Sequence, residues 1–184
     1  KGDLLIEIVL RGRGGQGVVT AGELLVKAAV SENKYGQSIP FFGGERRGAP
    51  VVSYVRLSDS KITIHRNVYN PEIVAVFDSS LFNVMDPLEG LIPNGIVVLN
   101  ASTKHESLSN AYYIDANRIA KELGLVIAGW PVVNTIMMGA VAKITKLITP
   151  DALAKAIDET FEGKIAEVNK EGAERGFNEV STLD

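Results

Sequence analysis

The stretch from residue 4 to residue 33 constrains the fold of this chain more than any other. It contains an apolar run, Leu4 to Leu10, then a glycine-rich segment, Arg11 to Gly17, and then a long amphipathic segment. This order predicts a buried strand, a tight glycine loop and a helix that ends near Asn33. Glycines 12, 14 and 17 permit a sharp turn, so backbone N–H groups at the helix start can face a ligand or a partner.

The charge of the glycine loop favours an anion. Arg11 and Arg13 flank the glycines, and the positive end of the helix dipole adds to their attraction. A phosphate or a carboxylate would suit this corner.

The same glycines fit the G-x-G-x-x-G pattern of dinucleotide-binding proteins. A nicotinamide site also needs an acidic residue about 20 positions further on, to bind the ribose hydroxyls. The corresponding region here, Tyr35 to Pro40, contains no carboxylate. Nicotinamide binding therefore stands as one interpretation, beside a loop that serves only tight packing of strand and helix.

Length and composition indicate one compact domain over residues 1–184. The chain is 46% hydrophobic, and its net charge of −3 gives no general attraction to nucleic acid or to anionic membranes. The longest apolar stretches are too short to span a bilayer, and the beginning does not have the pattern of a signal peptide. We therefore expect a cytoplasmic protein.

The absence of cysteine excludes disulfides, a thiol nucleophile and ordinary iron–sulfur ligation. Any electron carrier must sit on another chain. His65 and His105 have no neighbours at metal-ligand spacing, so both are expected on the surface and no metal site is predicted. No nucleophile elbow or serine–histidine pair is present, and no catalytic residue is assigned to this chain.

A second unusual loop follows the predicted second strand, Tyr35 to Ile39, which we expect to stop at Pro40. The loop combines three glycines and two prolines with Phe41, Phe42, Glu45, Arg46 and Arg47. If a helix joins the first two strands, they run parallel, and both loops lie at the same carboxyl edge of the sheet. This edge would then be basic, because it would carry Arg11, Arg13, Arg46 and Arg47. The two phenylalanines could then be core residues or contacts for a partner or a planar ligand group.

The rest of the chain predicts a three-layer α/β/α fold with a mixed, mainly parallel sheet. Residues 51–57 and 61–66 alternate as in a hairpin, and later apolar runs at 73–77, 96–99 and 112–114 predict further strands. Asp78 is expected to cap the following helix, and Gly124 to close another.

The last third of the chain predicts helices. Residues 131–148 form a helix that is apolar over more than half its surface and is therefore buried, either in the fold or in a homodimer. Thr149 and Pro150 begin the next helix, which Gly163 breaks. The polar tail from Phe177 to Asp184 is expected to be loose.

Three motifs in this order resemble the gamma subunit of 2-oxoacid:ferredoxin oxidoreductases. The resemblance covers the chain from about Leu4 to about Phe177. The motifs are Arg11 to Gly17 with Thr20-Ala21, Phe41 to Pro50, and Asn134-Thr135 with Met138 to Lys143.

The resemblance implies a subunit that is not catalytic alone. Such complexes oxidatively decarboxylate a 2-oxoacid to an acyl-coenzyme A and pass electrons to ferredoxin. It implies alpha, beta and delta partner subunits, which carry thiamine diphosphate, magnesium and [4Fe–4S] clusters. The loops look like those of the pyruvate and branched-chain 2-oxoacid members.

In this family the gamma module is associated with coenzyme A binding and subunit packing. The resemblance implies that a group of residues in the two loops contacts coenzyme A or a partner subunit. These residues are Arg13, Gly14, Gly15, Gln16, Gly17, Glu45, Arg46 and Arg47. Two alternatives remain open: a free-standing nucleotide-binding module and a purely structural assembly subunit.

Overall fold

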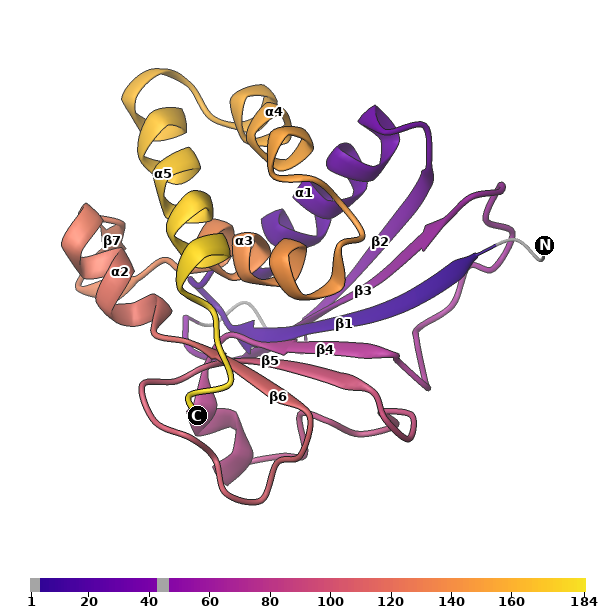
Figure 1. Ribbon diagram of the computed structural model, residues 1–184, viewed down its shortest axis with the longest axis horizontal. Coiled ribbons are helices and arrows are strands. Elements are labelled where there is room, and N and C mark those ends of the chain that lie inside the picture. The colour runs from indigo at the N-terminus through magenta and orange to yellow at the C-terminus, as the bar shows by residue number, and fades with distance from the viewer. Residues whose placement is uncertain (1–3, 43–46) are drawn as a thin grey trace.

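The computed structural model describes residues 4–42 and 47–184. Strands and helices alternate through the first two thirds, and the last third is helical (Figure 1). The elements are β1 (Leu5–Arg13), α1 (Val18–Ser31), β2 (Tyr35–Phe42), β3 (Pro50–Ser58), β4 (Ile73–Val76), the 3₁₀ helix η1 (Ser79–Asn83), β5 (Ile96–Asn100), β6 (Ala111–Ile114), α2 (Ala116–Leu123), β7 (Val126–Ile127), β8 (Trp130–Pro131), α3 (Asn134–Thr145), α4 (Pro150–Thr160) and α5 (Gly163–Glu179).

The main sheet has six strands in the order β2-β3-β1-β4-β5-β6. β3 pairs antiparallel with β1 and with β2, whereas β1, β4, β5 and β6 pair parallel with one another. β1 and β2 therefore run in the same direction with β3 between them. The predicted α/β class and the mixed, mainly parallel sheet are confirmed.

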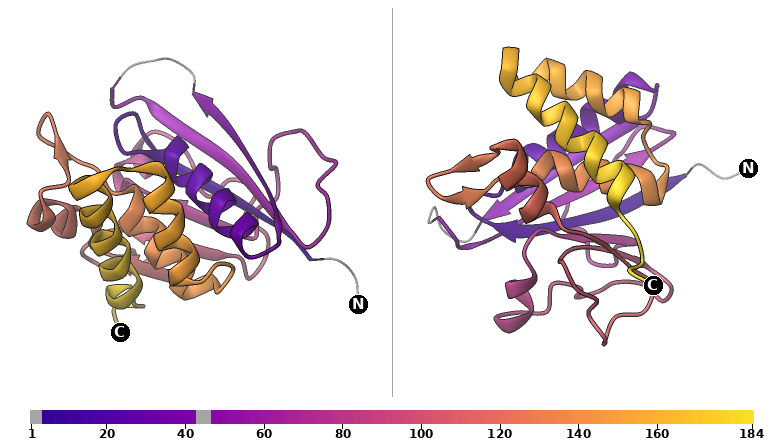
Figure 2. Two further views of the ribbon diagram at one scale, coloured as in Figure 1. Left: turned by 90° about the horizontal axis from the view of Figure 1, so that it is seen from above. Right: turned by 60° about the vertical axis from the view of Figure 1, so that its left-hand side comes forward.

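One face of the sheet is covered by α1, α3, α4 and α5 (Figure 1, Figure 2). The strand period of two turns Ile8 and Leu10 of β1 toward these helices and Val9 toward the other face. α3 is buried from Asn134 to Ala142, inside this domain. The apolar helix predicted at residues 131–148 is thus accounted for by the fold itself.

α3 and α5 pack at very close range. A Cβ atom at Gly139 of α3 would lie 1.9 Å from the carbonyl oxygen of Ala173, and one at Gly176 of α5 would lie 2.0 Å from that of Ile136. Neither position can accept a side chain, so small residues in both helices set their separation.

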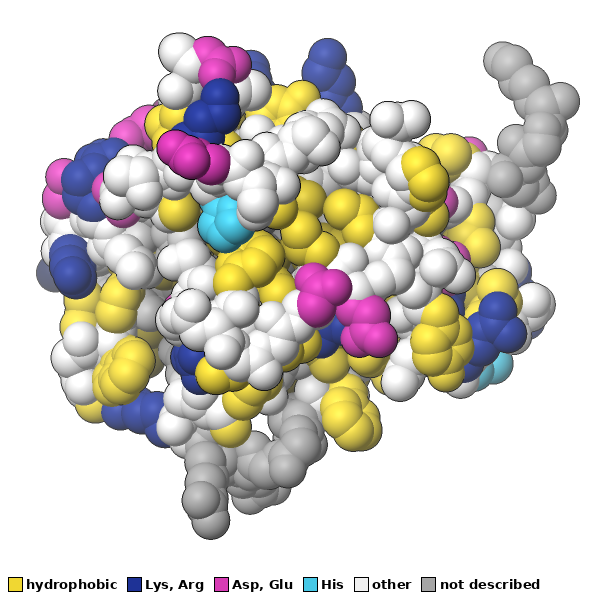
Figure 3. Space-filling view, turned by 90° about the horizontal axis from the view of Figure 1, so that it is seen from below, with side chains coloured by type: hydrophobic (Ala, Val, Ile, Leu, Met, Phe, Trp, Pro, Cys, Tyr) yellow, Lys and Arg dark blue, Asp and Glu magenta, His cyan; other side chains and the backbone are white. Residues whose placement is uncertain are grey.

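The opposite face of the sheet is covered by η1 and extended segments rather than by α-helices. Phe82, Met85 and Leu88 pack there against the strands. Figure 3 shows hydrophobic side chains reaching the surface on this side. The third layer of the fold is therefore thin.

The predicted hairpin between residues 51–57 and 61–66 is wrong. β3 already has a strand on each side, so residues 61–66 add no ladder and form no strand. The buried side chain of Arg56 holds this region instead, by donating from Nη1 to the carbonyl of Arg66 (2.5 Å) and from Nη2 to that of Asn67 (3.1 Å). Its Nε also donates to Oε2 of Glu7 (2.9 Å).

Two further boundaries differ from the prediction. β2 continues through Pro40 to Phe42, because β2 is an edge strand and a proline there can leave its missing N–H on the open side. At the end of the chain α5 runs to Glu179, and Ser181 and Tyr113 then exchange backbone hydrogen bonds of 2.7 and 3.0 Å. The tail is thus attached to β6 rather than loose.

Local capping signals were predicted correctly. Thr149 caps α4 by accepting from the N–H of Ala152, Gly124 ends α2 in the left-handed conformation, and Asp78 caps η1. Within the described residues, none of the helices has the length and apolar character needed to cross a membrane.

Candidate functional site at the carboxyl edge of the sheet

The glycine loop and the end of the second loop lie side by side. The N–H of Gly14 donates to the carbonyl of Ala49 (2.8 Å), and the N–H of Gly48 donates to the carbonyl of Gly14 (3.1 Å). The prediction that both loops share one edge is confirmed for these residues. Glu45 and Arg46 lie outside the described residues, as does the side chain of Phe42.

Arg13 fastens three segments together. Its Nη1 donates to the carbonyl of Gly48 (2.9 Å), its Nε donates to Oγ of Ser80 (3.1 Å), and Nε lies 3.6 Å from Oδ2 of Asp78. These partners follow β4 and precede β3, so Arg13 joins the ends of neighbouring strands.

The side chain of Gln16 forms hydrogen bonds within the protein. Its side-chain oxygen accepts from the N–H of Arg13 (2.7 Å), and its Nε2 donates to Oδ2 of Asp78 (2.9 Å). The residue is buried, with 6% of its surface exposed. Gln16 therefore stabilises the loop between Arg13 and Asp78.

The glycines of the loop have different roles. A Cβ at Gly12 would lie 2.6 Å from Cγ2 of Val18, and one at Gly17 would lie 2.4 Å from Nδ2 of Asn134. At these two positions glycine is needed for tight packing, as one interpretation of the motif predicted. Gly15 has a φ of +96° and open space around it, since the nearest atom to an added Cβ, Nε of Arg47, is 3.7 Å away.

An open groove of about 510 Å³ lies beside these loops. Among the described residues, no hydrogen bond is found for the backbone N–H groups of Gly15 and Gly17, or for those of residues 18–20 in the first turn of α1. Such groups and the positive end of the helix suit an anion. The groove is lined by Arg13, Gly14, Gly15, Gly17, Val18, Val19, Thr20, Arg47, Val51, Ile127, Val132, Asn134 and Phe161.

Asn134 and Asp78 belong to the site, although the sequence assigned neither of them a role in it. Asn134 begins α3, and its buried side chain packs on Gly17, so the starts of α1 and α3 meet at the groove. Asp78 accepts from Gln16 and from the N–H of Ser80. The signals were present in the Asn134-Thr135 motif and in the polar end of the 73–77 run.

Arg11 is separated from this groove. It lines a different hollow, on the thin face of the sheet, together with Phe41, Tyr54 and Met85. The prediction of a basic edge therefore holds for Arg13 and Arg47 but not for Arg11. Phe41 is 58% exposed, so it is not a core residue.

The donor set does not fit an iron–sulfur cluster, because the sequence has no cysteine to ligate one. Within residues 4–42 and 47–184 no group of three or more potential metal ligands is found. His65 is exposed, and His105 is half-buried with its ring 4.8 Å from that of Phe82. The lining of the groove combines Arg13, Arg47 and the start of α1 with apolar side chains such as Val51 and Ile127.

The strand order also argues against a nicotinamide site. In the dinucleotide-binding fold the second strand lies beside the first and supplies the acidic residue at its end. Here β3 separates β1 from β2, and β2 contains no carboxylate. The glycine loop therefore does not have the neighbouring acidic strand that a nicotinamide site needs.

Comparison with known proteins identifies the family. The family model described as pyruvate ferredoxin/flavodoxin oxidoreductase matches residues 7–179. The chain belongs to this family. It is 47% identical to pyruvate synthase subunit PorC of Methanothermobacter thermautotrophicus, over 97% of this chain and 98% of that one.

Two further relatives support the same family assignment and the same fold. The chain is 43% identical to the common gamma subunit of the pyruvate/ketoisovalerate oxidoreductases of Thermococcus kodakarensis, over 96% of this chain and 97% of that one. The crystal structure of pyruvate oxidoreductase subunit PORC from Thermotoga maritima matches with a TM-score of 0.82 at 30% identity, over 96% of this chain and 97% of that one. The resemblance to gamma subunits of 2-oxoacid:ferredoxin oxidoreductases is confirmed.

Proposed function

We propose that this oxidoreductase subunit works in a complex that converts pyruvate or a branched-chain 2-oxoacid to an acyl-coenzyme A with ferredoxin as electron acceptor. Its relatives are named as subunits of pyruvate synthase and of pyruvate/ketoisovalerate oxidoreductases. Alpha, beta and delta subunits would supply thiamine diphosphate, magnesium and the clusters, because this chain lacks the cysteines to hold a cluster.

Within that complex, we propose that the groove beside the glycine loop contributes to the coenzyme A site. The observation that carries this proposal is the convergence of Arg13, Arg47 and the N–H groups of the first turn of α1 on one groove. Coenzyme A carries a pyrophosphate and a further phosphate, and charge-assisted hydrogen bonds from arginine and backbone N–H groups suit such groups. Gly14 and Gln16 would support the loop from within.

The two arginines would have different tasks. Arg13 already donates to Gly48 and Ser80, so it holds the loops in place and adds positive charge. Arg47 is exposed and its side chain lies over Gly15, so it is the one that can close on a phosphate.

The test is Arg47→Ala in the assembled complex. Loss of one charge-assisted contact should raise the KM for coenzyme A by at least about tenfold, while the KM for the 2-oxoacid stays unchanged. Arg66→Ala is the matched control, because Arg66 is exposed and lies near Arg56, at the other end of β1. An unchanged KM for coenzyme A in Arg47→Ala would leave the chain an assembly role only.

A further inference from the structure

The short hairpin of β7 and β8 is an exposed apolar feature of this subunit. Val126, Ile127 and Trp130 are 38%, 60% and 47% exposed. No charged residue occurs from Gly124 to Val133. In both views of Figure 2 the hairpin projects from the body of the domain. An exposed apolar projection of this kind is typical of a protein interface.

The geometry of the hairpin gathers its two largest side chains on one face. Ile127 and Trp130 are directly opposite in the ladder, so their side chains lie on the same side. Ile127 lines the groove beside the glycine loop, so the hairpin borders this groove. The turn between them, Ala128-Gly129, has positive φ at both residues, as a two-residue type I′ turn requires.

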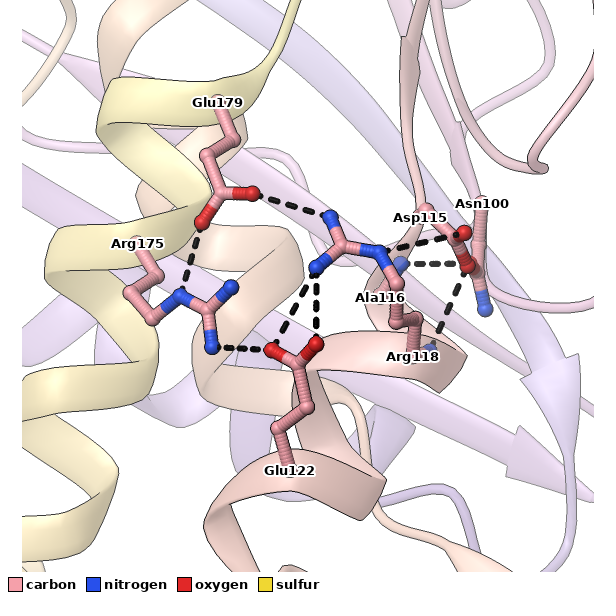
Figure 4. A network of polar contacts seen from close by, with 7 residues as sticks. All are labelled: Asn100, Asp115, Ala116, Arg118, Glu122, Arg175 and Glu179. Atoms are coloured by element: carbon pink, nitrogen blue, oxygen red, sulfur yellow. Dashed lines mark hydrogen bonds and ion pairs between the residues drawn. The ribbon is translucent and has the colours of Figure 1, made fainter.

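The base of the hairpin is held firmly. The N–H of Leu125 donates to the carbonyl of Ala120 in α2, and the N–H of Val132 donates to the carbonyl of Leu125, both at 2.8 Å. α2 is in turn joined to α5 by ion pairs among Arg118, Glu122, Arg175 and Glu179 (Figure 4). A side-chain pair presented on such a base loses little freedom when it is bound.

We propose that this hairpin is an apolar arm that inserts into an apolar depression on another subunit of the oxidoreductase complex. The inference rests on the proposed function for the existence of that subunit. Tryptophan is enriched among the residues that carry the binding energy of interfaces, and an aromatic and an aliphatic side chain together form a compact anchor. The docked subunit would form the missing wall of the open groove.

A second copy of this chain is a poorer occupant. In a two-fold dimer the same patch meets itself, so the groove that Ile127 lines would face its own copy. Arg13 and Arg47 line that groove, and the dimer would therefore bring like charges together. A different subunit avoids this repulsion.

The experiment uses the double variant Ile127→Ala, Trp130→Ala and the rest of the complex produced without this chain. Because both side chains are exposed, the isolated variant should keep the thermal midpoint of the wild type. Its affinity for the remaining subunits should fall by at least about tenfold. Ile165→Ala is the matched control, since Ile165 is 62% exposed on α5 and should assemble normally.

Trp130 is the only tryptophan of the chain, so it also reports directly on docking. A subunit labelled with 5-fluorotryptophan should give one fluorine resonance that shifts on assembly and becomes protected from a water-soluble paramagnetic quencher. An unshifted, accessible resonance in the assembled complex would overturn the arm.

The outcomes separate this inference from the proposed function. If the wild type assembles and the double variant assembles equally well, the arm is overturned while the proposed function stands. If the wild type does not join the other subunits, the proposed function itself fails. A wild-type homodimer that the double variant abolishes would assign the hairpin to a second copy and overturn the arm.

Discussion

Two clusters of arginines and carboxylates in this subunit behave differently. Between α2 and α5, Arg118 and Arg175 share Glu122 and Glu179, with Asp115 nearby (Figure 4). Both arginines have carboxylate partners within the cluster. The cluster joins α2 to α5.

At the carboxyl edge of the sheet the balance differs. Among the described residues, Arg13 has one carboxylate nearby, that of Asp78 at 3.6 Å, and this carboxylate also accepts hydrogen bonds from Gln16 and Ser80. Beside it, Arg47 and the first residues of α1 line an open groove. The N–H groups of residues 18–20 have no hydrogen-bond partner among the described residues. Arginine alone therefore does not mark a binding site. What distinguishes the edge is positive charge and donors that lie on a groove.

The largest expected effect concerns the packing that shapes this edge. Gly17→Ala would place a Cβ at a φ of +80° and 2.4 Å from Nδ2 of Asn134. Left-handed strain and overpacking together should lower the free energy of unfolding by about 2–5 kcal/mol, measured by urea denaturation.

Gly124→Ala is the control on the α2 side, because it has a similar φ of +75° but nothing within 4 Å. It should lose only about 1–2 kcal/mol, the cost of the backbone strain. Equal losses in the two variants would show that contact with Asn134 does not constrain the loop.

A smaller effect is expected from the carboxylate of the edge. Asp78→Ala removes acceptors from Gln16 and Ser80 and the carboxylate near Arg13, all partly or fully buried, and should cost about 2 kcal/mol. The measurement is the urea midpoint of the isolated subunit.

Glu179→Gln in the α2–α5 cluster is the comparison for Asp78→Ala. Because its ion pairs are exposed, it should cost less than about 1 kcal/mol. A larger loss of stability in Glu179→Gln than in Asp78→Ala would mean that the exposed α2–α5 cluster stabilises the fold more than the contacts of Asp78 do.

The smallest effect is a pH dependence confined to the helix cluster. Hydrogen bonds from Arg175 and Arg118 lower the pKa of Glu122, and those from Arg175 lower the pKa of Glu179 despite its partial burial. A lowered pKa in the folded state stabilises the fold above the ordinary glutamate pKa, and this contribution disappears as the pH falls through the folded value.

The thermal midpoint of the wild type should therefore fall more than that of Glu122→Gln, Glu179→Gln between about pH 5 and pH 3. Identical pH profiles would mean that the cluster does not stabilise the fold.

Much of the candidate edge followed from local sequence. Glycines after an apolar run produce a sharp turn into a helix, and the helix between β1 and β2 makes those strands run the same way, so residues 14 and 49 could be expected near each other. Capping by Asp78, Thr149 and Gly124 was also predictable, because each cap acts within a few residues.

The errors arose where partners are distant in sequence. Residues 61–66 alternate like a strand, but β1 and β2 occupy both sides of β3. The sequence likewise could not indicate that Arg11 lines a hollow apart from Arg13, because that depends on which elements cover each face of the sheet.

By itself, the sequence determined the strand–loop–helix start, the α/β class, the family and the basic character of one edge, because these depend on residue type and short spacing. Only the tertiary structure decided that β3 lies between β1 and β2, that Asp78 and Gln16 hold Arg13, and that Asn134 and Ile127 join the groove. Such contacts join residues tens of positions apart, and the competition among buried partners selects them.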